Sequence, residues 1–182
     1  MVSRFLLVFL LSFTQSATAQ EESYIQPGLL AASLTYSPST MLNRPVNNFY
    51  VSGFAEYFID SKFSFRGDSY LFRTNSFTNI FMTDAFRSYF GVAYHINKGN
   101  WDTHVGIQPG ITIMNRKVFR SKIEPSAALR LGTTYYVWKY FHFFANLTYV
   151  RSRVRVPDTG IFDADELLFS AGLGFQIQTK KN

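Results

Sequence analysis

The sequence predicts an all-β fold, in which eight antiparallel strands in up-and-down order close into a transmembrane β-barrel. Eight stretches of the chain alternate between an apolar and a mixed face, which is the periodicity of a β-strand. Short and long connections also alternate along the chain, as they do in membrane barrels. The chain has 182 residues, and this length fits a single domain with short appendages.

The composition excludes several other classes of protein. Aromatic residues make up 18% of the chain, which argues against intrinsic disorder. Cysteine is absent, so disulfide scaffolds, thiolate zinc sites and cysteine nucleophiles are excluded. The mean hydropathy is −0.02, and beyond the N-terminal stretch no apolar run is long enough for a membrane-spanning helix.

Residues 1–19 are expected to be a secretory signal peptide. Arg4 precedes an apolar run at 5–11, and the segment closes on the small residues of Ala17-Thr18-Ala19, which resemble a cleavage site. The apolar run is too short to span a membrane. We therefore expect an exported chain with a periplasmic N-terminal segment at 20–27, a barrel at 28–178 and a C-terminal tail at 179–182.

The clearest expected strand is 101–113. Val105, Ile107 and Ile111 share its apolar face, whereas His104 and Gln108 lie on the other face. The closing stretch repeats this alternation, and no helical stripe competes with it. In order, the expected strands are 30–36, 49–59, 63–71, 89–96, 101–113, 126–137, 141–149 and 167–178.

Three tight turns are expected, at 60–62, 97–100 and 138–140. They set the pairing of the adjacent strands, and directly opposed residues must point to the same face. In all three registers, residues of the apolar face pair with residues of the apolar face of the neighbouring strand. The pairs expected from them include Glu56 with Arg66, Tyr57 with Phe65, Val92 with Val105, His95 with Asp102, Tyr135 with Phe143 and Tyr136 with His142. The long connections are expected at about 37–47, 75–85, 114–123 and 152–165.

The apolar face is expected to contact lipid. The mixed face carries few charges, whereas a water-facing surface carries roughly 25–35% charged residues. An eight-stranded lumen is also too narrow for the bulky apolar face. Aromatic residues gather near the tight turns, as in an interfacial girdle: Tyr57, Tyr94, Trp101, Trp138, Tyr140 and Phe141. A soluble, secreted ligand-binding barrel is the rival architecture.

This pattern and the closing strand at 168–178 resemble the small outer-membrane β-barrels of the OmpX and OmpA-transmembrane type. The resemblance covers residues 28–178. It implies a place in the cell outer membrane, contact with outer-membrane lipid, and insertion by the outer-membrane assembly machinery. One feature departs from the family: such barrels often end on an aromatic residue, whereas Ile177 is followed by Gln178, Thr, two Lys and Asn.

Polar residues on the mixed face are expected to form an ionic network inside the barrel, because an unpaired buried charge is costly. Glu56 and Arg66 should meet across their hairpin, and Asp68 could pair with Arg66 or Arg130. We interpret the network as a plug. A narrow, water-filled ion path is the alternative, although an eight-stranded barrel rarely leaves room for one. The expected interior polar residues are Glu56, Arg66, Asp68, His104, Gln108, Arg130, His142 and Asn146.

The net charge of +6 is concentrated in the expected outer loops, which argues against nucleic acid as a partner. Cations at that rim would contact the phosphates of lipopolysaccharide, and a merely solvated loop is the alternative. The candidate residues are Arg116, Lys117, Arg120 and Lys122.

The loop at 75–85 differs from the others because it contains Phe77, Ile80, Phe81 and Met82. An exposed apolar loop can dock a partner protein, and folding back onto the rim is the alternative.

No catalytic, cofactor or metal site is expected. The histidines His95, His104 and His142 have neither a serine and an acid at motif spacing nor metal-ligand spacing. The expected role is therefore non-enzymatic: a structural or surface-binding outer-membrane barrel with four long loops. An enzyme that modifies lipid A or phospholipids is the alternative from another class.

Overall fold

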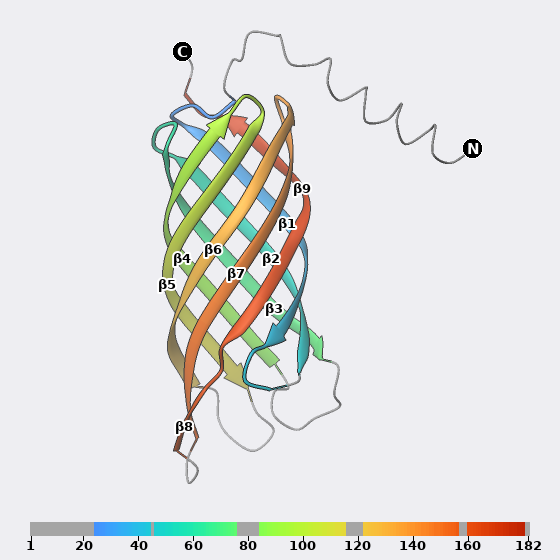
Figure 1. The fold of residues 1–182 in the computed structure, drawn as a ribbon, viewed down its shortest axis with the longest axis vertical. Coiled ribbons are helices and arrows are strands. Elements are labelled where there is room, and N and C mark those ends of the chain that lie inside the picture. The colour runs from blue at the N-terminus through green and yellow to red at the C-terminus, as the bar shows by residue number, and fades with distance from the viewer. Residues whose placement is uncertain (1–23, 45, 76–83, 116–121, 157–159, 181–182) are drawn as a thin grey trace, which may run out of the picture.

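A computed structural model describes residues 24–44, 46–75, 84–115, 122–156 and 160–180. These residues form strands, turns and short connecting segments (Figure 1). No helix among them is long and apolar enough to cross a membrane. The strands are β1 (Leu29–Met41), β2 (Asn47–Phe58), β3 (Phe63–Asn75), β4 (Asp84–Lys98), β5 (Trp101–Asn115), β6 (Lys122–Trp138), β7 (Phe141–Val156), β8 (Gly160–Asp163) and β9 (Glu166–Gln178).

Eight of these strands, β1 to β7 and β9, form a closed antiparallel barrel. Consecutive barrel strands pair with each other, and β1 pairs with β9 to complete the ring. The short strand β8 pairs with the far part of β7, in a hairpin that projects below the barrel (Figure 1). The predicted fold class is therefore confirmed.

The two faces of the barrel differ as the alternation predicts. Large apolar side chains point outward: Leu34 is 75% exposed, Ile107 62% and Phe175 58%. Residues at alternate positions, such as Tyr50 and Leu168, are fully buried inside. In water this outer surface would be one continuous apolar patch, which soluble monomers avoid. The surface suits the acyl chains of a bilayer.

Two of the three expected turn registers are found in the structure. Glu56 lies opposite Arg66, and Tyr136 lies opposite His142. The third register is wrong, because His95 lies opposite His104 and Val92 opposite Ile107. The turn contains two residues instead of four, and its first residue, Gly99, has a φ of 59°. Two-residue hairpins favour such left-handed conformations.

The first and last long connections are shorter than expected, because their strands continue beyond the apolar pattern. Strand β1 extends to Met41 rather than ending near residue 36, and β7 extends to Val156. In β1 the added positions alternate between buried Ser37 and Ser39 and exposed Pro38. A strand therefore persists where its inner face is polar and no apolar stripe marks it. The other two long connections contain 76–83 and 116–121, outside the described residues.

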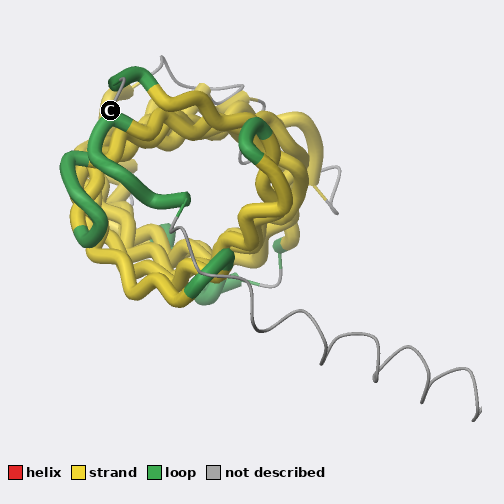
Figure 2. The backbone as a smooth tube through the Cα atoms, turned by 90° about the horizontal axis from the view of Figure 1, so that it is seen from above, coloured by secondary structure: helices red, strands yellow, loops and turns green. Residues whose placement is uncertain are grey.

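The segment that precedes β1 covers the end of the barrel that carries the tight turns, here called the turn end. Ile25 is 3% exposed and packs in one cluster with Phe58 and Tyr136, and Tyr24 stacks on Tyr136 at 5.9 Å between ring centroids. Gly28, with a φ of 88°, turns the chain into β1. Figure 2 shows this segment running from the wall toward the middle of the opening. Residues 24–27 thus cover part of the turn end instead of merely leading into β1.

We expect Gly91→Ala to destabilise the barrel by about 1–3 kcal/mol, as overpacking of a tight contact usually does. A Cβ atom at Gly91 would overlap the carbonyl oxygen of Ile107 and lie 2.8 Å from the Cα of Gln108. The matched control is Gly67→Ala, whose Cβ would meet nothing nearer than 3.6 Å. Urea unfolding of both variants in lipid vesicles measures the difference, and equal stability would contradict the expectation.

Candidate functional site

Two groups of polar side chains lie inside the barrel. The turn-side cluster contains Glu56, Ser64, Arg66, Asp68, His95, Asp102, His104, Gln108, Arg130 and Asn146, all buried. The loop-side cluster contains Ser39, Asn48, Tyr50, Arg87 and Glu166, also buried. Each residue stands at an inward position of its strand, because successive side chains alternate between the two faces. The charged side chains of both clusters are therefore buried in the lumen.

Arg66 connects the acidic residues of β2 and β3. Its Nη1 donates to Glu56 Oε2 at 3.1 Å, and its Nε and Nη2 donate to the carboxylate of Asp68 at 2.9–3.1 Å. The guanidinium carbon also lies 3.5 Å from the centroid of the Phe54 ring. Such paired, charge-assisted hydrogen bonds are strong and directional. Of the two partners expected for Asp68, Arg66 is the one found.

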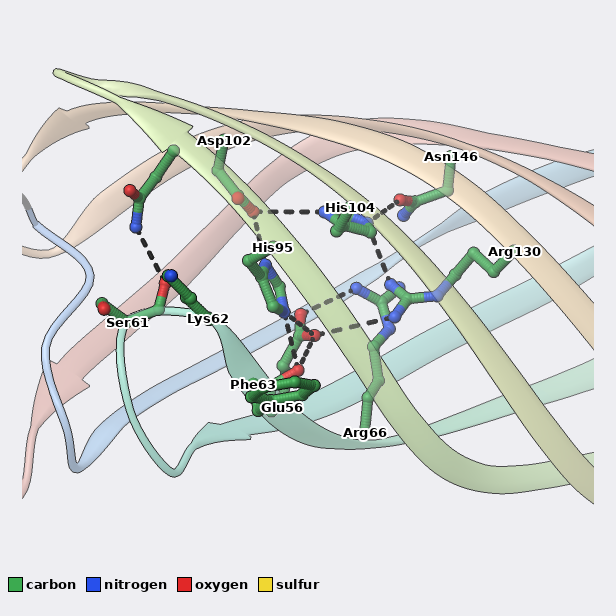
Figure 3. Close-up of polar contacts among 12 residues, drawn as sticks. Glu56, Ser61, Lys62, Phe63, Arg66, His95, Asp102, His104, Arg130 and Asn146 are labelled. Atoms are coloured by element: carbon green, nitrogen blue, oxygen red, sulfur yellow. Dashed lines mark hydrogen bonds and ion pairs between the residues drawn. The ribbon is translucent and has the colours of Figure 1, made fainter.

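Asp102 lies between two histidines. The Nδ1 atoms of His95 and His104 approach the same oxygen, Asp102 Oδ2, at 2.8 Å and 3.2 Å. On the far side of each ring, His95 Nε2 lies 2.8 Å from Ser64 Oγ, and His104 Nε2 lies 3.1 Å from Asn146 Oδ1. Figure 3 shows His95, Asp102, His104 and Asn146 converging from β4, β5 and β7. Strand pairing explains the arrangement, because His95 and His104 are directly opposed.

Arg130 extends the turn-side cluster across the lumen (Figure 3). Its Nη1 lies 3.1 Å from His104 Nε2, and its Nη2 lies 3.6 Å from Glu56 Oε1. Its Nε has no hydrogen-bond partner among the described residues. Gln108 completes the group, donating from Nε2 to Asp68 Oδ2 at 2.7 Å. The cluster thus joins strands from β2 to β7 in one polar network.

The loop-side cluster is centred on Glu166. Arg87 Nη2 lies 2.5 Å from Glu166 Oε2, Asn48 Nδ2 donates to Oε1 at 2.7 Å, and Tyr50 donates to both oxygens at 3.1–3.2 Å. Ser39 also donates to Glu166. The sequence interpretation missed this ion pair. The alternation of the strands could have revealed it, because residues two positions apart point to the same face. Arg87 and Glu166 lie two residues before the inward-facing Tyr89 and Leu168.

Of the remaining predicted interior and loop residues, one lies in the lumen and the others are not described. His142 lies in the lumen but outside both clusters, with Nδ1 2.8 Å from Gln176 Oε1. Arg116, Lys117 and Arg120 lie outside the described residues, as does most of the loop at 75–85, and the side chain of Lys122 is not described either.

The expected aromatic girdle lies on the outer surface near the turn end. Trp101 is 56% exposed and Trp138 60%. Trp101 packs on Tyr135 at 4.8 Å between ring centroids, and Trp138 packs on Tyr140 and Phe141 at 5.9 and 6.1 Å. Tyr57 and Tyr94 also point outward, and Tyr94 contacts Phe63. Amphipathic rings at this level suit a membrane–water interface.

Ser64, His95 and Asp102 stand in the order of a nucleophile, a base and an acid. The Ser64 Oγ to His95 Nε2 and His95 Nδ1 to Asp102 Oδ2 distances are both 2.8 Å. Sequence spacing could not reveal this line, because the residues come from β3, β4 and β5. However, Ser64 is fully buried on the lumen side and also donates to Glu56 Oε1 at 2.7 Å. The hydroxyl therefore faces a packed network instead of the lipid.

No protein-family model matches the sequence, and no curated protein sequence matches it. Three solved structures illustrate its structural similarity. The N-terminal β-barrel domain of Pseudomonas aeruginosa OprF is 12% identical with a TM-score of 0.57, covering 84% of this chain and 99% of its own. Neisserial surface protein A is 13% identical with a TM-score of 0.56, at 86% and 97% coverage.

The third is Ail of Yersinia pestis, solved in complex with the heparin analogue sucrose octasulfate. It is 15% identical with a TM-score of 0.51, covering 84% of this chain and all of its own. At these identities the comparison establishes the fold. The chain has the architecture of the small eight-stranded β-barrels of bacterial outer membranes.

Proposed function

We propose that this protein is a non-enzymatic barrel of the bacterial outer membrane, with a structural or surface-binding role. The observation that carries the proposal is the inverted distribution of polarity: bulky apolar side chains cover the outer wall, while ion pairs fill the lumen. Export by the signal peptide at 1–19 and insertion by the outer-membrane assembly machinery belong to the same proposal.

Cell fractionation tests the location. We expect the protein in outer membranes, and we expect its mobility in SDS gels to change on heating, because a closed barrel resists SDS until it is boiled. The rival soluble barrel predicts release with the periplasmic or culture fluid and no heat-dependent mobility. Recovery in those soluble fractions would refute the proposal.

We propose that the barrel is closed to solutes. The turn-side and loop-side clusters and the inward tyrosines Tyr50, Tyr70 and Tyr89 support this, since all are buried inside the wall. Ile25 is also buried, at the turn end. In planar lipid bilayers we expect no stepwise conductance from the purified protein. Reproducible channels would instead support the water-filled path.

The surface-binding part of the proposal concerns the end opposite the tight turns, here called the loop end. Its described cations include Arg151 and Arg153, which are exposed. The candidate residues Arg116, Lys117, Arg120 and Lys122 follow β5 directly in the sequence. Guanidinium and ammonium groups there would bind the phosphates of lipopolysaccharide. Replacing the four candidates by glutamine should reduce retention of lipopolysaccharide during purification. A separate partner protein at the 75–85 loop remains part of the proposal.

A lipid-modifying enzyme is the second candidate, favoured only by the line of Ser64, His95 and Asp102. Mass spectra of lipid A and phospholipids from cells with the wild-type protein, with Ser64→Ala and without the protein would decide between them. We expect three identical profiles, because Ser64 is shielded from lipid. A modified lipid that disappears with Ser64→Ala would establish the enzyme.

A further inference from the structure

We propose that the turn-side cluster contains a binding site for one divalent transition-metal ion such as Zn²⁺. The ligands are His95, Asp102 and His104, each of which can offer one ligand atom within 4.8 Å of the others. All three residues are buried in the lumen. This site is independent of the structural or surface-binding role proposed above.

The donor atoms suit zinc. Two imidazole nitrogens and one carboxylate oxygen are common zinc ligands, and a fourth position is often left to water. The Nδ1 atoms of His95 and His104 lie 2.8 Å and 3.2 Å from Asp102 Oδ2. Ligand atoms around tetrahedral zinc lie about 3.3 Å apart, so small side-chain movements would admit the ion. Its entry would displace the protons that the nitrogens share with the carboxylate.

The far sides of both rings are already held, as they are in established zinc sites. His95 Nε2 lies 2.8 Å from Ser64 Oγ and 3.4 Å from Glu56 Oε1, and His104 Nε2 lies 3.1 Å from Asn146 Oδ1. A ligating histidine usually donates its second N–H to a carboxylate, carbonyl or similar acceptor, which fixes the ring and its tautomer. At His95 the acceptor is Ser64 Oγ, which itself donates to Glu56. At His104, Nε2 lies 3.1 Å from both Asn146 Oδ1 and the donor Arg130 Nη1, so donation to Asn146 requires Arg130 Nη1 to move away. Each Nδ1 is then left to face the ion.

Two further observations favour a cation at Asp102. Its Oδ1 has no hydrogen-bond partner among the described residues, although Asp102 is only 1% exposed. An unpaired carboxylate oxygen at a buried position is costly, and a metal ion would satisfy it. The cluster also holds three carboxyl groups, those of Glu56, Asp68 and Asp102, against the two guanidinium groups of Arg66 and Arg130. Arg130 opposes the ion at His104, but the excess of carboxyl groups favours it.

Metal titration of the whole protein, purified without a histidine tag and stripped with a chelator, tests the proposal. We expect one Co²⁺ or Zn²⁺ per chain by elemental analysis, and Co²⁺ absorption bands typical of tetrahedral nitrogen and oxygen ligands. Zn²⁺ should also raise the midpoint of urea unfolding of the wild-type protein, and EDTA should reverse that increase. Failure of the wild-type protein to bind either ion would overturn the proposal.

Variants locate the ion. Asp102→Asn and His104→Gln should each weaken Zn²⁺ binding at least tenfold, and Asn146→Ala, which leaves all three ligands in place, should weaken it roughly 10- to 100-fold. The matched control is His142→Gln, a lumen histidine that contacts Gln176 instead of the cluster; it should bind as tightly as the wild type. Heat-dependent mobility in SDS gels confirms that each variant is folded. Equal affinity in His104→Gln and His142→Gln would place the ion elsewhere and refute the site.

Discussion

Arg66→Met is expected to destabilise the barrel by about 3–5 kcal/mol, the usual cost of removing one partner of a buried ion pair. Arg66 is 2% exposed and satisfies both Glu56 and Asp68. Methionine fills much of the same volume, so the main loss is electrostatic. Glu56 would keep its hydrogen bond from Ser64, the contact with His95 at 3.4 Å and the contact with Arg130 at 3.6 Å, and Asp68 would keep its hydrogen bond from Gln108. None of these contacts replaces the two close ion pairs with the Arg66 guanidinium.

Equilibrium urea unfolding in lipid vesicles measures this loss, and Arg153→Met provides the matched control. Arg153 also forms an ion pair, with Asp163 at 3.3 Å, but its side chain is 66% exposed. Solvent screens such a pair, which contributes only about 0–1 kcal/mol. Similar losses in the two variants would show that the turn-side cluster does not stabilise the barrel.

Leu131→Arg is expected to cost about 2–4 kcal/mol, because it places a charge on the lipid face near the middle of the membrane. Leu131 is 55% exposed on the outer wall and lies opposite Val105 and Leu147 on its two neighbouring strands. The adjacent residue in the chain, Arg130, is fully buried in the lumen. One step along the strand therefore separates a position that accepts arginine from one that should reject it.

The control for the second prediction is Thr134→Ser, on the buried lumen face. It removes a methyl group and keeps the hydroxyl, so its cost should be small. Both variants are compared by unfolding in vesicles of the same lipid. If they are tolerated equally, the outer wall does not contact lipid.

The strands could be predicted because alternation is a local property. In β5, successive side chains point to opposite faces of the sheet. The inward positions of His104 and Gln108 therefore follow from the outward positions of Val105 and Ile107. The pairing of Glu56 with Arg66 was predictable for a similar reason, since a three-residue turn sets it. Local information failed where a strand continued into a polar region, as in β1.

The register between β4 and β5 shows a limit of this reasoning. A two-residue turn and a four-residue turn shift the pairing by two positions, and both keep every side chain on its own face. The pattern therefore could not distinguish His95 opposite Asp102 from His95 opposite His104. The structure shows the latter, and that register places both imidazole rings beside one carboxylate.

By itself, the sequence determined the strand pattern, the apolar outer wall and the polar character of the lumen, because these follow from the period of two. Only the tertiary structure decided which polar groups meet. Arg87 and Glu166 are joined across the lumen, Asn146 reaches His104 from β7, and Ile25 packs against Phe58 and Tyr136 at the turn end. Such contacts depend on the closure of the whole barrel and on the accumulated register of several strand pairs, and no local pattern encodes either one.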